Sequence, residues 1–314
     1  MKFCVRSIIL YVLAYRAGRC KEMDYQDYGG YLSVERKMSE NTKNAYMRDL
    51  RSFETFVKER GLVGPQEAAN TEILAYLMEL RAENKSKATL NRKLASLRVY
   101  YSYLQRKGLI GENPADGIKS PKADKKEIEY ISIEEVDKLM ELPDASLKGM
   151  RDRAILELLY ATGIRASELI EMKTEDVNLR MGFVKCAPIH GKARIIPMGR
   201  ICRKAMEDYI LDARDKILKG KEEAVLFTNY AGKPITRQGL WKILKEYGQA
   251  AELSVGLTPQ VLRNSFAVHM LRNGADVKSL QELMGHEDIS ATQAYLAVVK
   301  NRIKDVYDRT HPRA

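Results

Sequence analysis

Apolar residues recur every three or four positions along most of this 314-residue chain, which is the spacing of one face of an α-helix. The segment KATLNRKLASLRVYYSYLQRKG shows this best, with its apolar face formed by Leu90, Leu94, Leu97, Tyr101 and Leu104. Breaks and capping signals flank such runs between residues 23 and 118, for example at Ser39-Glu40-Asn41-Thr42, Gly61 and Asn84-Lys85-Ser86. We therefore predict four or five short helices in this region.

A second helical face lies in GMRDRAILELLYATGIRASEL, through Ile155, Leu158, Leu159 and Ala161. Gly163 is expected to end this helix, and Arg165 to open the next one. Glu168 follows Arg165 by three residues, so the two side chains share a helix face. Because a buried arginine needs an acidic partner, we expect Glu168 to orient Arg165.

Three further helices are predicted between Thr258 and Val299. Thr258 and Pro259 are typical of an N-cap followed by proline at the first helical position, so a helix should run from there to about Asn273. A second should run from about 277 to 284 and stop at Gly285, leaving His286 on a turn. The third should carry Tyr295, with a buried side formed by Ile289, Leu296 and Val299.

One segment alternates as strands do. GFVKCAPIHGKARIIPMG predicts two short strands around a turn at His190 and Gly191, within a small sheet from Val177 to Pro197. The segment IKSPKADKKEIEYIS is polar, basic and without apolar periodicity, which is typical of an exposed linker. These patterns predict a mainly α protein with two domains, at 23–118 and 129–314, joined by a linker at 119–128.

The first 22 residues carry a basic start and a short apolar run. The run is too short to span a membrane, so we interpret 1–22 as a disordered tail or an over-extended gene start. The four cysteines form no CxxC pair, which argues against a disulfide framework and for a reducing compartment, the cytoplasm.

Charge points to nucleic acid as the partner. The formal net charge is +11, and no acidic residue lies between Glu83 and Glu112. A solvated helix face would normally mix both signs of charge, so this basic face is predicted to meet DNA phosphates. The candidate DNA-binding residues are Lys85, Lys87, Arg92, Lys93 and Arg98.

Three motifs carry a resemblance to a known family. They are ATGIRASEL around Arg165, LTPQVLRNSFAVH around Arg263, and LMGHEDISATQAY, which holds His286 and Tyr295. The chain resembles the tyrosine recombinases of the phage integrase family, most closely the bacterial Xer-type branch. Alone, a tyrosine on an apolar helix face usually belongs to the core. Here, however, the interval of 23 residues from Arg263 to His286 and that of nine residues from His286 to Tyr295 are those of the family. The resemblance implies an N-terminal SAM-like core-binding domain and a C-terminal catalytic domain of the DNA breaking-rejoining fold.

It also implies a reaction. In this family a tyrosine hydroxyl attacks a DNA phosphodiester, forms a 3′-phosphotyrosyl bond and frees a 5′-hydroxyl, without metal or cofactor. Tyr295 matches the nucleophile, Arg165 and Arg263 the phosphate-binding arginines, and His286 a further donor. Two guanidinium groups suit this task because each donates a planar pair of hydrogen bonds to phosphoryl oxygens. Glu168 would support Arg165.

The chain departs from the family pattern at three places. Gln260 stands where the family usually has histidine, and Asn264 where it commonly has a second one; glutamine can donate to a phosphoryl oxygen but cannot exchange a proton near neutral pH. The catalytic lysine is assigned to Lys192 by the GKxRIIPM pattern. The hairpin is short, however, so an ungapped alignment places Ile189 there, and Lys185 is the reserve candidate.

The resemblance implies double-stranded DNA as substrate and a tetramer in the synapse, formed by copies of this chain or with a related recombinase subunit. The C-terminal VVKNRIKDVYDRTHPRA resembles the helix that family members dock into a neighbouring subunit. No membrane or metal partner is expected, since His190, His269 and His311 lack metal-binding spacing and His269 is interpreted as a core residue. Two alternatives stay open, a DNA-binding relative without catalysis and a type IB topoisomerase.

Overall fold

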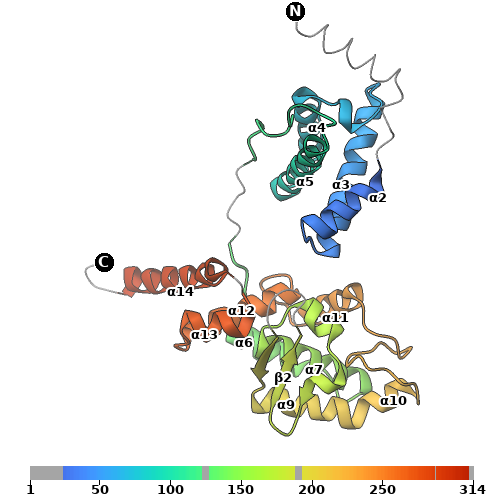
Figure 1. Ribbon diagram of the computed structural model, residues 1–314. Coiled ribbons are helices and arrows are strands. Elements are labelled where there is room, and N and C mark those ends of the chain that lie inside the picture. Colours follow the sequence, from blue (N-terminus) through green and yellow to red (C-terminus); the bar gives the residue numbers. More distant parts are fainter. Residues whose placement is uncertain (1–23, 122–126, 188–192, 287, 311–314) are drawn as a thin grey trace, which may run out of the picture. The chain divides into compact units, whose positions relative to one another are not determined.

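The computed structural model describes residues 24–121, 127–187, 193–286 and 288–310, with side chains described as far as Val299 (Figure 1). Residue contacts divide the chain into two compact units, unit 1 and unit 2, and the boundary in the sequence falls between Lys126 and Glu127, inside the predicted linker. The predictions for residues 1–22 and for Ile189, His190, Lys192 and His311 lie outside the described residues.

Unit 1 is helical. Its elements are α2 (Tyr25–Gly30), the π-helical turn η1 (Tyr31–Glu35), α3 (Glu40–Glu59), the 3₁₀ turn η2 (Pro65–Glu67), α4 (Asn70–Ala82) and α5 (Lys87–Arg106). The Ser39 and Ser86 side chains accept hydrogen bonds from the Thr42 and Thr89 amides, so the predicted caps start α3 and α5. Both helices have 20 residues and are longer than the short helices expected.

The core of unit 1 is formed by the apolar faces of α3, α4 and α5 together with the aromatic residues of α2. The predicted α5 face is buried throughout: Leu90, Leu94, Leu97, Tyr101 and Leu104. Tyr28 of α2 packs edge-on against Tyr100, with ring centroids 5.4 Å apart. Burial of this many large side chains explains how a unit of this size keeps its basic helices in place.

Unit 2 is mostly helical and contains one small sheet. Its helices include α6 (Ile133–Glu141), α7 (Leu147–Thr162), α8 (Ala166–Glu171), α9 (Arg200–Glu207), α10 (Arg214–Leu218), α11 (Arg237–Ala250), α12 (Pro259–Arg272), α13 (Val277–Met284) and α14 (Ile289–Thr310). A π-helical turn, η4 (Asp208–Ala213), joins α9 to α10, and a 3₁₀ turn, η3 (Thr174–Asp176), precedes the sheet. The sheet is antiparallel in the order β1-β2-β3, with β1 at Val177–Asn178, β2 at Phe183–Cys186 and β3 at Arg194–Pro197.

The predicted helix boundaries in unit 2 follow from capping. Gly163 and Gly285 adopt the left-handed conformation and end α7 and α13, and the Thr258 hydroxyl accepts from the Val261 amide at the start of α12. Gly163 is also required by close packing, because a Cβ there would lie 2.3 Å from the Phe266 ring. These caps place Arg165 and His286 beside helix ends.

One packing prediction was wrong. Tyr295 and Val299 of α14 are buried, but Ile289 is 45% exposed. Ile289 is the first residue of α14, and the buried cluster that α14 shares with α12 and α13 starts further along the helix. The prediction gave the correct buried face of α14, but it started the buried part of that face too early, at Ile289. Among the residues described, no helix is long and apolar enough to cross a bilayer.

Candidate active site

The two candidate arginines are held by backbone carbonyls at helix ends. Arg263 of α12 is 3% exposed; its Nη2 donates to the Met284 carbonyl at 2.7 Å and its Nη1 to the Gly163 carbonyl. Arg165, at the N-cap of α8, donates from Nη2 to the Gly285 carbonyl at 2.8 Å. The last carbonyls of a helix lack partners within it, so α7 and α13 offer acceptors that fix both guanidinium groups. Neutral acceptors leave the positive charge of Arg263 largely uncancelled, whereas Arg165 Nη1 also lies 3.4 Å from Glu168 Oε1.

Glu168 has a different principal partner from the one expected. Its Oε1 and Oε2 accept hydrogen bonds from Arg194 Nη1 and Nη2 at 2.6 and 2.9 Å. The side chain of Arg165 is further away, with Nη1 3.4 Å from Oε1, and Arg165 contacts Glu168 mainly through its backbone amide, which donates to Oε2. Burial alone would raise the pKa of Glu168, but the bonds from Arg194 and the Arg165 amide lower it overall. Glu168 is therefore a buried carboxylate that positions Arg194 first and the α8 N-terminus second.

Arg194 was missed by the sequence reading. It lies on β3, and its Nε donates to the Leu283 carbonyl at 2.7 Å, so it links β3 to α8 and to the end of α13. The signal available in the sequence was a basic residue at the start of an apolar strand, in KARIIPM. That pattern is common in edge strands, and only the folded positions of Glu168 and Leu283 give it meaning.

His286 follows α13 and packs against the candidate nucleophile. Its ring lies parallel to that of Tyr295, with centroids 6.4 Å apart. Its Nδ1 is 2.8 Å from the hydroxyl of Thr292, a fully buried residue that the sequence reading also missed. Burial, assisted by Arg263, Arg165 and Arg194, lowers the pKa of His286 to about 4. The ring is thus neutral at pH 7, and Nε2 remains to meet a substrate oxygen.

Tyr295 of α14 is only 5% exposed, and its hydroxyl donates to Asn264 Oδ1 at 2.9 Å. The same oxygen accepts from Gln260 Nε2 at 2.8 Å, and Asn264 Nδ2 donates to the Glu129 carbonyl at 2.8 Å. Burial raises the pKa of Tyr295, and the positive charge of Arg263 opposes this rise. The two residues that depart from the family pattern, Gln260 and Asn264, therefore contact each other and the tyrosine.

The structure brings together most of the candidate residues. Arg165, Arg263, His286, Tyr295 and Gln260 converge from α8, α12, the turn after α13, and α14. Lys192 lies outside the described residues. The reserve candidate, Lys185, is exposed on β2 opposite Ile195 and lines a pocket of about 160 Å³ beside Glu168.

His269 is packed in the interior as expected, with Nδ1 2.9 Å from the Tyr160 hydroxyl. Across the described parts of the chain, no group of three or more His, Cys, Asp or Glu side chains is arranged to hold a metal ion. Strong positive charge beside a tyrosine, with neutral donors around it, suits displacement at a phosphate diester.

The basic face predicted on α5 needs correction. Lys93 is buried, with Nζ 3.3 Å from Asp49 Oδ1 and 3.0 Å from the Tyr76 hydroxyl, and Arg92 also pairs with Asp49. Arg98 donates to the Ala115 and Ile118 carbonyls and to the Ser120 hydroxyl. A carboxylate from α3 and a returning loop meet these cations, so Lys93 is not on the surface. Lys85 and Lys87 are exposed at the start of α5.

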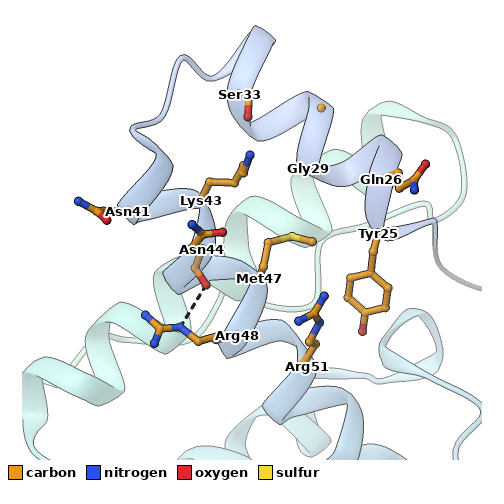
Figure 2. Close-up of a pocket in the computed structure, with 11 residues that line it drawn as sticks. Tyr25, Gln26, Gly29, Ser33, Asn41, Lys43, Asn44, Met47, Arg48 and Arg51 are labelled. Atoms are coloured by element: carbon orange, nitrogen blue, oxygen red, sulfur yellow. Dashed lines mark hydrogen bonds between the residues drawn. The ribbon is translucent and has the colours of Figure 1, made fainter.

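A basic pocket of about 780 Å³ opens instead between α2 and the N-terminal half of α3 (Figure 2). Figure 2 shows Lys43, Asn44, Arg48 and Arg51 along α3, with Arg51 beside the Tyr25 ring. The sequence reading missed this face because acidic residues interrupt the charge along α3, among them Glu40, which pairs with Lys43. On the folded helix, Lys43, Arg48 and Arg51 line the same pocket.

Comparison with known families agrees with this arrangement. The phage integrase family profile matches residues 129–302, and the profile of the phage integrase N-terminal SAM-like domain matches residues 25–108. The chain belongs to the phage integrase family. The predicted fold class, mainly helical with a SAM-like N-terminal domain and a small sheet in the catalytic domain, is confirmed.

Relatives define the branch. Tyrosine recombinase XerD of Oceanobacillus iheyensis is 41% identical over 295 residues, covering 93% of this chain and 99% of the relative. Tyrosine recombinase XerD of Listeria monocytogenes is 41% identical over 292 residues, covering 92% and 98%. The protein is thus a site-specific tyrosine recombinase of the Xer type, as the motifs predicted.

Solved structures agree at the level of the fold. The XerH site-specific recombinase bound to palindromic difH substrate, in a post-cleavage complex, aligns with a TM-score of 0.70 at 18% identity and covers 91% of this chain and 84% of that chain. The lambda integrase dimer bound to a COC′ core site aligns with a TM-score of 0.67 at 21% identity, covering 86% and 93%.

Proposed function

We propose that this recombinase cuts and rejoins double-stranded DNA with Tyr295 as nucleophile, Arg165 and Arg263 as phosphate-binding groups, and His286 and Gln260 as further donors. The observation that carries the proposal is the convergence of both arginines, anchored by neutral carbonyls, on the ring pair of His286 and Tyr295. The XerD relatives share this chain over nearly their full length, which supports the same activity.

The geometry supports a balanced phosphoryl transfer. The Tyr295 oxygen forms a bond to phosphorus while the bond to the 5′-oxygen breaks, and the phenol proton leaves as the 5′-oxygen gains one. The bond energy is kept in the phosphotyrosine, and attack by a 5′-hydroxyl of the partner duplex reverses the step. Negative charge gathers on the phosphoryl oxygens, which Arg165 and Arg263 stabilise without reorganising.

The donors divide the remaining work. We assign to neutral His286 the tautomer in which Nδ1 accepts from the Thr292 hydroxyl, so that Nε2–H donates to a phosphoryl oxygen. Gln260 donates but cannot transfer a proton, which removes one source of general acid-base catalysis, an effect on the order of 10²–10⁴ in rate when it is lost completely. We assign protonation of the 5′-oxygen to Lys192, with Lys185 on β2 as the reserve candidate.

We propose that unit 1 binds the duplex through the basic pocket on α3 and the exposed Lys85 and Lys87 at the start of α5. Positive charge near phosphates releases counterions and gives affinity, while Asn41 and Asn44 add amides that can read base edges. We propose that the two predicted domains, 23–118 and 129–314, both bind DNA.

We further propose that the active form is a tetramer on DNA, of this chain or with a related subunit, and that it resolves chromosome dimers in the cytoplasm. The XerD naming of the relatives and the XerH complex with difH support this role. Strand exchange by 3′-phosphotyrosyl chemistry needs four nucleophiles, which a single chain does not hold.

The test is covalent trapping on nicked suicide substrates drawn from the host's chromosomal recombination sites. Wild type is expected to form an adduct that survives denaturation, Tyr295→Phe none, and Gln260→His a faster one. Tyr295→Phe is the matched control, since it keeps the buried ring and removes only the hydroxyl.

Two outcomes would contradict the proposal. Tight, site-specific binding without adduct from wild type or Gln260→His would make the protein a DNA-binding relative that has lost catalysis. Relaxation of supercoiled plasmid lacking any recombination site would favour a topoisomerase.

A further inference from the structure

A chain of amides surrounds the nucleophile. Asn264 lies one turn after Gln260 on α12, and its Oδ1 accepts from both the Gln260 amide and the Tyr295 hydroxyl. Its Nδ2 donates to the carbonyl of Glu129, in the segment that leads into α6. All four groups belong to unit 2, so the network is internal to one compact unit.

The directions of these bonds are fixed by chemistry. A backbone carbonyl can only accept, so the side of Asn264 that faces Glu129 must be the NH₂ group and the other side must be the oxygen. That oxygen has no hydrogen to give, so in the contact with Tyr295 the phenol must be the donor. A phenolate at the same place would face a carbonyl oxygen and lose the bond.

We propose that Asn264 is a positioning residue for the nucleophile: oriented by the Glu129 carbonyl, it holds the Tyr295 hydroxyl as a protonated donor, while the Gln260 amide donates to the same Asn264 oxygen. This inference rests on Tyr295 being the nucleophile. It gives the two departures from the family pattern one shared task, the control of the protonation of Tyr295.

Among the described residues, the other groups that face Tyr295 are basic or neutral. Arg263 comes from α12, Arg165 from the N-cap of α8, and His286 stacks on the ring from the turn after α13. The arginines and the Gln260 donor lower the pKa of the phenol, against burial, which raises it. The contact with Asn264, by contrast, favours the neutral phenol, because Asn264 Oδ1 can only accept a hydrogen bond from the Tyr295 hydroxyl.

The decisive experiment measures the protonation of Tyr295 directly. 3,5-Difluorotyrosine is incorporated at position 295 of the full chain, because the fluorine atoms lower the phenol pKa and bring its titration to milder pH. The ¹⁹F resonance is then titrated without DNA. Asn264→Ala is expected to lower the pKa of this phenol by about one unit, the shift that loss of one net hydrogen bond produces. Gln260→Ala is expected to raise the pKa.

Asn273→Ala is the matched control, since Asn273 is an exposed asparagine at the other end of α12 and should leave the resonance unchanged. An unchanged or raised pKa in Asn264→Ala overturns the proposal. Should Asn264→Ala fail to fold, Gln260→Ala provides the test, because the Gln260 side chain is exposed. An unchanged or lowered pKa of Tyr295 in Gln260→Ala then overturns the proposal that Gln260 and Tyr295 donate to one Asn264 oxygen.

The same variants are then followed by suicide-substrate trapping across pH. Asn264→Ala should shift the rise of adduct formation to lower pH by the same amount as the phenol pKa, which a loss of stability alone would not do. Because the fluorine titration needs no cleavage, it reports on Asn264 even if no variant forms an adduct, and so separates this inference from the proposed function.

Discussion

Two pairs of cations, one in each unit of this recombinase, are held in opposite ways. In unit 1, Arg92 and Lys93 pair with Asp49 and so bind α5 to α3. In unit 2, Arg165 and Arg263 bond mainly to carbonyls at the ends of α7 and α13. An ion pair cancels the charge it holds, whereas a carbonyl fixes the guanidinium and leaves the charge for a phosphate. Basic residues in a sequence therefore acquire their roles from their acceptors.

The largest effect is expected where a carbonyl-anchored arginine is replaced. Arg263→Lys keeps the charge but cannot donate to Gly163 and Met284 while also presenting a planar pair of donors. We expect adduct formation on suicide substrates to fall by about 10²–10³, as for removal of one oxyanion donor. Single-turnover trapping measures this. Arg153→Lys, at an exposed arginine of α7, is the control, and equal losses in both variants would contradict the comparison.

The second prediction concerns Glu168, a buried carboxylate beside the arginines of the site. Glu168→Gln removes the charge that Arg194 contacts twice and should lower the free energy of unfolding by about 2 kcal/mol at pH 7. The folded-state pKa of Glu168 is lowered, so its contribution is present above the unfolded pKa and is lost as pH falls through the folded one. Urea titrations should therefore show the difference between wild type and Glu168→Gln shrinking in acid. A constant difference would contradict this role.

The unit 1 side of the comparison is tested by two substitutions with opposite readouts. Lys93→Met removes a buried ion pair and should lower stability by about 1–3 kcal/mol while leaving DNA affinity nearly unchanged. Arg48→Met, on the α3 pocket, should weaken DNA binding and reduce the salt-dependence slope by about one, with little loss of stability. Fluorescence anisotropy across salt concentrations separates them. A salt-dependence slope reduced by about one in Lys93→Met would contradict this prediction and would favour the α5 face as the DNA-binding surface.

The sequence allowed strong prediction where the signal was local. Thr258, Gly163 and Gly285 correctly predicted helix ends, and the motifs that resemble the family predicted that Arg263, His286 and Tyr295 share one site. Lys93 and Arg194 were misread or missed because their roles depend on Asp49 and Glu168, partners that only the folded chain brings near. Ile289 failed for a related reason, since periodicity gives the face of a helix but not where its packing begins.

His286 gives the smallest and most specific prediction, because it senses the uncancelled charge of the site. Its folded-state pKa of about 4 lies below that of an unfolded histidine, about 6.5. The unfolded chain therefore binds the extra proton first, and the stability linked to His286 falls as pH drops from about 6.5 to 4.

Titration of the histidines by NMR, with His286→Gln to assign the resonance, should show that the His286 imidazole stays neutral to about pH 4. In Arg263→Lys this value should stay low, since the lysine keeps the charge, whereas in Arg263→Met it should rise. A value unchanged in Arg263→Met would mean that the charge of Arg263 does not contribute to the pKa of His286. The charge of this carbonyl-anchored arginine would then not reach a group that shares its substrate, and the contrast between the two pairs of cations would lose its electrostatic basis.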